Sequence, residues 1–129
     1  MLREPPFDNA DAGAGGDAGP SVTEVLRAAL APLQARIDAA FIYGVPAKRT
    51  APEHGDIDVM IVGSGIAYVE VIPYFIKAAR RIGRGINPGI YTADELARKL
   101  AGGNRLVLAV LKQRKIFLIG SEEDLPRPR

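Results

Sequence analysis

Residues 39–63 read AAFIYGVPAKRTAPEHGDIDVMIVG, and this stretch decides the fold. Two short apolar runs, 39–44 and 56–63, each end at a glycine, which is typical of β-strands. The second run begins with two aspartates one residue apart. Because side chains alternate along a strand, Asp56 and Asp58 are predicted to share one face at its exposed end. Two neighbouring carboxylates repel each other when both are ionised, so this pattern requires a compensating charge.

The segments around this stretch predict helices. Residues 22–33 carry apolar side chains at helical spacing, and Ser21 with Glu24 forms an S-x-x-E capping box before them. A second helix is predicted over 67–82, with a kink or a late start at Pro73. Further helices are predicted over 93–101, where Thr92 and Glu95 form another capping box, and over 104–113.

Two further strands are predicted over 86–92 and 115–120. Pro88 and Gly89 weaken the first of them, which favours an edge position or a bulge. The order of elements predicts an α/β or α+β domain with a mixed four- to five-stranded sheet and helices packed on it. The expected organisation is a disordered tail over 1–20, one domain over 21–120, and a flexible C-terminal tail over 121–129.

Composition excludes several classes of protein. The 129 residues include no cysteine, which excludes a disulfide framework and a thiolate metal site. No stretch approaches the ~20 apolar residues that cross a bilayer, so we expect no membrane association and a cytoplasmic protein. The net charge of +2 is too small to indicate nucleic-acid binding. A basic cluster predicts a solvated helix face, with phosphate contact as the alternative, and contains Lys77, Arg80, Arg81 and Arg84.

The two aspartates have two interpretations from the residues alone. A bound magnesium ion would neutralise them, because this hard cation takes one or two carboxylates together with nucleotide phosphates. Alternatively, D-x-D at a strand start is a turn signal, in which one aspartate caps a loop and the other is solvated. The spacing leaves both interpretations open.

The run FIYG (41–44), the loop after it, and the strand DIDVMIVG (56–63) resemble the minimal nucleotidyltransferase domains of the DNA polymerase β superfamily. More narrowly, the chain is similar to bacterial nucleotidyltransferase-like domains that are often linked to winged-helix regulators. The distal INP…Y strand and the final apolar strand also match, so the resemblance covers residues 37–120.

The resemblance implies a function and a set of site residues. Asp56 and Asp58 match the pair that is catalytic and binds magnesium in the family. Gly44 matches a glycine that holds the triphosphate, and the nucleotide-binding loop after it contains Val45, Lys48 and Arg49. A nucleotidyltransferase of this kind transfers a nucleotidyl group from a nucleoside triphosphate to a hydroxyl of an acceptor, and here the acceptor is unknown.

The chain also departs from the family pattern. Val45 replaces a serine whose hydroxyl binds phosphate, and Pro46 has no N–H to donate. The strand over 86–92 offers Asn87 where the family has a third carboxylate, and an amide cannot act as a base at neutral pH. Asp94 and Glu95 fit the first turn of a helix better. Glu53 in the loop is a minor candidate for the missing acid, and His54 is predicted to be solvated.

These departures support an alternative function. The chain is then a catalytically degenerate interaction module, either a regulatory domain or the antitoxin-like partner of a toxin. The expected partners are a nucleotide and, in addition, a partner protein or a nucleic acid. A homo-oligomer is left open.

Overall fold

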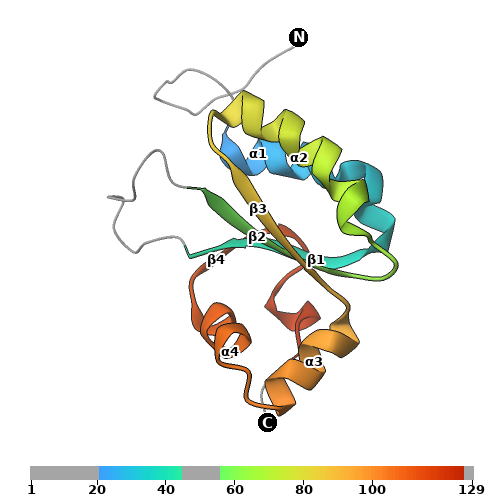
Figure 1. Ribbon diagram of the computed structural model, residues 1–129, viewed down its shortest axis with the longest axis vertical. Helices are drawn as coiled ribbons and strands as arrows, with labels where there is room; N and C mark the ends of the chain where they lie inside the picture. The colour runs from blue at the N-terminus through green and yellow to red at the C-terminus, as the bar shows by residue number, and fades with distance from the viewer. Residues whose placement is uncertain (1–20, 45–55, 127–129) are drawn as a thin grey trace.

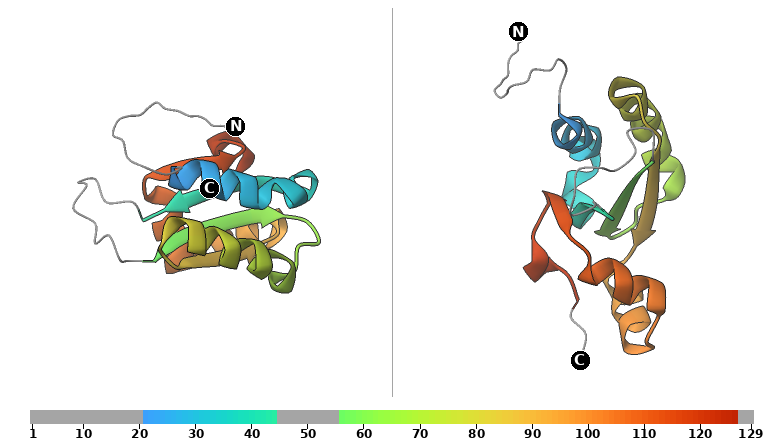
Figure 2. Two further views of the ribbon diagram at one scale, coloured as in Figure 1. Left: turned by 90° about the horizontal axis from the view of Figure 1, so that it is seen from above. Right: turned by 90° about the vertical axis from the view of Figure 1, so that its left-hand side faces the viewer.

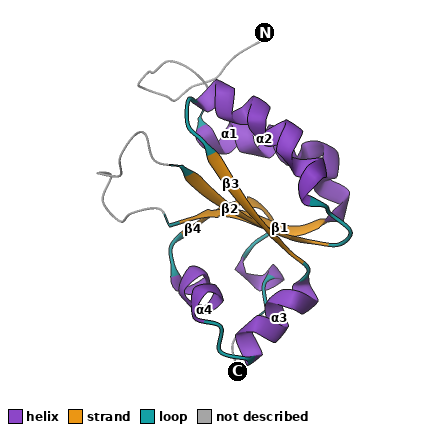
Figure 3. Ribbon diagram, in the orientation of Figure 1, coloured by secondary structure: helices purple, strands orange, loops and turns teal. Residues whose placement is uncertain are grey.

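The computed structural model describes residues 21–44 and 56–126. Within these ranges the chain forms an α+β fold with a four-stranded mixed sheet, as the sequence predicts (Figures 1 and 3). Its helices and strands are α1 (Val22–Leu30), η2 (Ala31–Arg36), β1 (Ile37–Tyr43), β2 (Ile57–Gly63), α2 (Tyr68–Ile82), β3 (Ile86–Tyr91), α3 (Ala93–Ala101), α4 (Arg105–Lys112), β4 (Lys115–Ile119) and η3 (Glu122–Asp124).

The strand order across the sheet is β3-β2-β1-β4. β1 pairs antiparallel with both β2 and β4, whereas β2 and β3 pair in parallel and are connected by α2. Since β2 and β3 run in the same direction, both begin at one end of the sheet, where β1 ends. The paired aspartates lie at this end.

Helices cover both faces of the sheet. α1 and α2 lie side by side on one face, and α3 and α4 lie on the other (Figures 1 and 2). The alternation along β2 divides its side chains between two cores: Ile57 and Ile61 pack under α1 and α2, and Met60 and Val62 pack against α3 and α4. Asp58 belongs to the α3/α4 face by the same alternation. Phe41 of β1 is fully buried on that face.

The helix starts follow the predicted capping signals with one exception. The Ser21 hydroxyl accepts a hydrogen bond from the Glu24 N–H at 3.1 Å, and Thr92 with Glu95 forms the full reciprocal box. Of the two alternatives predicted at Pro73, a kink or a late start, the late start is wrong, because α2 begins at Tyr68 and continues through the proline. In a helix the missing N–H would bind the carbonyl of Val69, four residues earlier. Val69 is exposed, so water can hydrate that carbonyl.

The edge position predicted for the strand containing Pro88 is confirmed, because β3 is the outer strand beside β2. The Ile57 N–H donates to the Gly85 carbonyl at 2.9 Å and starts the parallel ladder. Alternate residues of β3 bond to β2 from there on, so the backbone of Pro88 faces away from the sheet. On β4, the outer strand at the other edge of the sheet, the carbonyls of Phe117 and Leu118 accept hydrogen bonds from the Arg27 guanidinium at 3.1 and 3.3 Å.

The domain extends past residue 120, where its end was predicted. Residues 122–124 form η3, and Leu125 is buried in the core on the α3/α4 face. Among the helices of the described ranges, none is long and apolar enough to cross a membrane.

Candidate functional site

Asp56 and Asp58 lie on one side of the sheet, as the strand alternation predicts. Asp56 directly precedes β2 and is exposed, and Asp58 is half-buried as the second residue of the strand. The amide nitrogen of Asn87 donates to Oδ2 of Asp56 at 3.3 Å and to Oδ1 of Asp58 at 3.4 Å. A single side chain can reach both carboxylates only because they face the same way. Asn87 therefore bridges the two carboxylates from the neighbouring strand.

The strand register places Asp58 in a row that crosses the whole sheet. It lies opposite Asn87 on β3 and opposite Tyr43 on β1, and Tyr43 in turn lies opposite Lys115 on β4. Directly opposite residues project from the same face, so these four side chains share the α3/α4 face. Burial raises the pKa of the Tyr43 hydroxyl, and the negative charge of Asp58 raises this pKa further, followed by a smaller effect of Tyr91. Tyr43 is therefore a neutral neighbour of the aspartates at pH 7.

Lys115 is the last residue of this row, but its ammonium group binds to residues other than the aspartates. Its side chain is 3% exposed and forms an ion pair with Glu122 at 2.9 Å. The ammonium group also donates to the carbonyls of Leu111 and Gln113, and it lies 5.8 Å from the centre of the Phe41 ring. These contacts satisfy a nearly buried cation. Lys115 fixes the end of α4 against β4.

Two glycines shape the surroundings of the aspartates. Gly44 follows β1 with a φ of 72°, which a residue with a side chain adopts only at a cost. A Cβ atom there would lie 3.8 Å from Oδ2 of Asp58, so the structure brings the predicted phosphate-binding glycine next to the predicted acid. A Cβ atom on Gly85 would lie only 2.7 Å from Oδ1 of Asp56. Sequence reasoning missed Gly85, because only the pairing of β2 with β3 brings it next to Asp56.

The other predicted site residues lie outside the described residues. This applies to Val45, Lys48 and Arg49 of the nucleotide-binding loop, and to Glu53 and His54, which all fall between Gly44 and Asp56. The structure thus describes Asp56, Asp58 and Gly44 of the predicted site, and the roles of Val45, Lys48 and Arg49 stay predictions.

Asp94 and Glu95 do not approach the paired aspartates. They lie in the first turn of α3, beyond the opposite end of β3, as the sequence predicts. Asp94 pairs with Arg98 at 2.6 Å, and Glu95 caps the helix through the Thr92 N–H. Among residues 21–44 and 56–126, no three acidic, histidine or cysteine side chains gather where they could hold a metal ion.

The donor set at Asp56 and Asp58 fits magnesium. Two carboxylates on one side supply the hard oxygen ligands that this ion takes, and phosphate oxygens and water complete its shell in nucleotide sites. The amide of Asn87 would add a third oxygen by turning over, because its oxygen and nitrogen have nearly the same shape. These oxygens are of the type that a divalent cation takes, whereas Asn87 cannot remove a proton from a hydroxyl.

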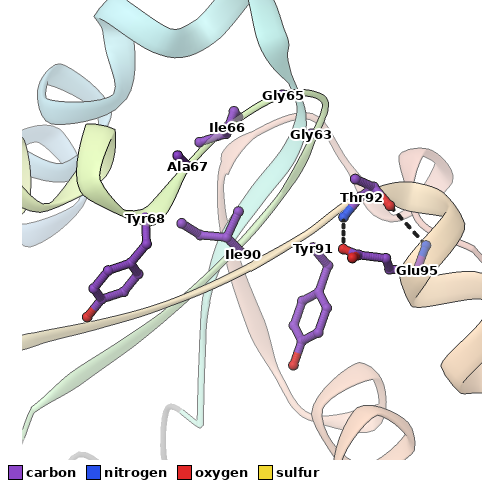
Figure 4. A pocket seen from close by; sticks show the side chains of 9 residues that line it. All are labelled: Gly63, Gly65, Ile66, Ala67, Tyr68, Ile90, Tyr91, Thr92 and Glu95. Atoms are coloured by element: carbon purple, nitrogen blue, oxygen red, sulfur yellow. Dashed lines mark hydrogen bonds between the residues drawn. The ribbon is translucent and has the colours of Figure 1, made fainter.

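A pocket of about 500 Å³ lies at the opposite end of the sheet, where β2 and β3 end (Figure 4). Its wall includes Gly63 at the end of β2, Gly65 after it, Tyr68 at the start of α2, and Ile90 on β3. The side chains of Ile90 and Tyr91 project from opposite sides of β3. The sequence contains no signal for this pocket, because its lining residues come from segments that are far apart along the chain.

Comparison of the sequence with models of known protein families and with curated proteins finds no match in either.

Proposed function

We propose that this chain binds a magnesium–nucleoside triphosphate at Asp56 and Asp58 and transfers its nucleotidyl group to a hydroxyl of an acceptor. The bond between the α- and β-phosphates breaks, and pyrophosphate leaves. One observation carries the proposal: the two carboxylates face the same side of the sheet, and one amide, that of Asn87, reaches both. A turn signal would not require this arrangement, because in a turn one aspartate caps a loop and the other is solvated. The resemblance of the surrounding sequence to minimal nucleotidyltransferase domains supports the same function.

Each residue of the site has a distinct part in this function. Asp56 and Asp58 would hold the cation, and Asn87 keeps their oxygens together. When bound, magnesium offsets the charge of the phosphates as the nucleotidyl group is transferred. Gly44 ends β1 in the left-handed conformation and directs the chain into the loop of Lys48 and Arg49, the predicted phosphate contacts. Without a third carboxylate, deprotonation of the acceptor falls to water or to the acceptor itself, so transfer is slow.

The binding step is tested by thermal unfolding with and without magnesium and ATP. A ligand present at ten times its Kd stabilises a protein by about 1.4 kcal/mol, which raises the melting temperature of a domain of this size by roughly 5–10 °C. We expect this rise only when both magnesium and ATP are present. Asp58→Asn removes one ligand and should abolish it, whereas Asp38→Asn, a matched change at an exposed position of β1, should keep it. No rise with the unmodified chain at millimolar nucleotide would refute the proposal.

A second function is favoured by Asn87 itself. An amide in the position of the third acid suits a domain that binds nucleotide without turning it over, which is the regulatory or antitoxin-like module. Incubation with nucleotide labelled on the α-phosphate separates the two functions. Label that becomes attached to a co-purified protein or RNA supports transfer. Magnesium-dependent binding without any labelled product supports the interaction module.

A further inference from the structure

The outer surface of α2 carries apolar side chains in a pattern that the core does not use. Val71, Phe75 and Ala78 are buried against the sheet and α1. A different side of the helix carries Val69, which is 75% exposed, and Ile76, which is 48% exposed. Pro73 and Arg80 continue the line at helical spacing, so Val69, Pro73, Ile76 and Arg80 form one stripe, which we call the α2 stripe. Contiguous exposed apolar surface rimmed by polar residues marks an interaction site, and Pro73 lies between Val69 and Ile76 along this stripe.

The α2 stripe begins beside the pocket at the end of the sheet. Tyr68, the residue before Val69, is 55% exposed and lines the pocket together with Ile66 and Ile90 (Figure 4). The salt bridge between Arg36 and Glu70, at 2.5 Å, holds the first turn of α2 against the end of η2. The pocket therefore lies next to the first turn of α2, which this ion pair holds in place. An apolar side chain of a bound molecule could enter the pocket as an anchor.

The other end of α2 is basic. Lys77, Arg80 and Arg81 lie exposed within its last two turns, and Glu70 is the one acidic residue of the whole helix. A molecule lying along α2 thus meets apolar side chains over the first half and positive charge over the second. The 15-residue helix is about 22 Å long, which matches a segment of about four helical turns.

We infer that α2 is the docking surface for an acidic amphipathic segment of another protein. Its apolar side chains would lie on the α2 stripe and enter the pocket, and its carboxylates would meet Lys77, Arg80 and Arg81. A second copy of this chain fits less well, because its α2 would offer only one acid, Glu70, to the three cations. Nucleic acid fits less well too, because phosphate contact does not use exposed Val69 and Ile76. This inference stands apart from the proposed nucleotide binding at the other end of the sheet.

The test uses fluorescence anisotropy of labelled synthetic peptides with the full chain. The probe is an amphipathic helical peptide of the same length as α2, with leucine at helical spacing and glutamate elsewhere. Two control peptides replace every glutamate with lysine or every leucine with serine. We expect saturable binding of the acidic leucine peptide alone, weakened by salt because part of the contact is electrostatic.

Variants locate the binding surface. Val69→Ser with Ile76→Ser should weaken binding at least tenfold, and Arg80→Glu with Arg81→Glu should weaken it similarly and remove its salt dependence. The matched apolar control is Leu106→Ser, because Leu106 is 65% exposed on α4, across the sheet. Lys99→Glu on α3 is the matched charge control. Both controls should bind the peptide as the unmodified chain does, and circular dichroism of each variant should show the unmodified helix content.

Several outcomes would overturn the inference. Equal binding of the lysine peptide, or unchanged binding by the Val69/Ile76 variant, would exclude the α2 stripe. Concentration-dependent dimerisation that the same substitutions abolish would assign the surface to a second copy. Binding of a DNA duplex in place of the peptide would assign it to nucleic acid. Peptide binding that appears only after the acids of residues 1–20 are neutralised would assign the surface to the chain's own N-terminal segment.

Discussion

Replacing Asn87 with aspartate tests the geometry of the carboxylate site directly, because the two side chains have nearly the same shape. The amide nitrogen lies 3.3 Å from an oxygen of Asp56 and 3.4 Å from one of Asp58. The substitution removes both hydrogen bonds and brings a third carboxylate to similar distances. Two unit charges this far apart repel by roughly 1 kcal/mol in water, and an exposed hydrogen bond contributes about as much at most. We expect the free energy of unfolding to fall by about 1–3 kcal/mol at pH 7 in EDTA.

The repulsion also determines how the stability of the Asn87→Asp variant depends on pH. The repulsion exists only while the carboxylates are ionised, so the loss of stability should be present at pH 7 and should shrink as acid neutralises them. Magnesium should restore the stability, because three carboxylates bind a divalent cation more tightly than two. Urea unfolding of the variant and the unmodified chain, in EDTA and in magnesium, measures all of these effects.

A matched control separates this repulsion from a general effect of added charge. Asn104→Asp makes the same chemical change at the start of α4, where Asn104 caps the helix through the Val107 N–H at 2.9 Å. Aspartate caps equally well, so we expect no loss of stability there. If Asn87→Asp unfolds at the same urea concentration as the unmodified chain in EDTA, the three side chains are not adjacent. If magnesium fails to restore its stability, the cation site is refuted.

Three further predictions concern the site, an exposed ion pair and the core. Gly85→Ala should displace Asp56, since its Cβ would lie 2.7 Å from a carboxylate oxygen. We expect the variant to bind magnesium–ATP more weakly while its melting temperature without ligand changes little. A lowered melting temperature with unchanged binding would contradict the assigned contact. The hydrogen bond from Arg36 lowers the pKa of Glu70, with a smaller effect from the Ala67 N–H. The unmodified chain should therefore be more stable than Glu70→Gln above pH 4.5, the ordinary pKa of the group, and this difference should be lost as the pH falls through the lowered pKa. Thermal melts between pH 7 and pH 3 check this, and a constant difference would be inconsistent with it. Phe41→Ala should lower the free energy of unfolding by about 3–5 kcal/mol in urea titrations, because Phe41 is fully buried; a loss below about 1 kcal/mol would show a loosely packed core.

Local signals in the sequence predicted the elements well. Thr92 with Glu95 identified the start of α3, since a capping box needs only residues three apart. Pro88 identified an edge strand for an equally local reason, because a proline cannot donate to a ladder. The late start expected at Pro73 failed by the same logic, because α2 runs through the proline and Val69, four residues earlier, is exposed.

The site was predictable only in part. The alternation along β2 was enough to place Asp56 and Asp58 on one side. The contacts of Asn87 and the approach of Gly85 depend on the register between β2 and β3, which are separated by the whole of α2. The charge environment of Tyr43 depends in the same way on its register with β2. Registers between distant strands are set by the packing of the complete core, so no short window of sequence contains them.

The two outer strands of the sheet limit how this chain can assemble. On β3 the middle one of the outward backbone positions is Pro88, which has no N–H, and on β4 the guanidinium of Arg27 already occupies two carbonyls. A strand from another molecule would meet a row of donors interrupted at Pro88 on the first edge and would have to displace an arginine at the second. Growth of the sheet from one molecule to the next, the route by which many β-proteins aggregate, is therefore disfavoured at both edges. Any complex that this chain forms is expected to be held by side chains on its helices and loops.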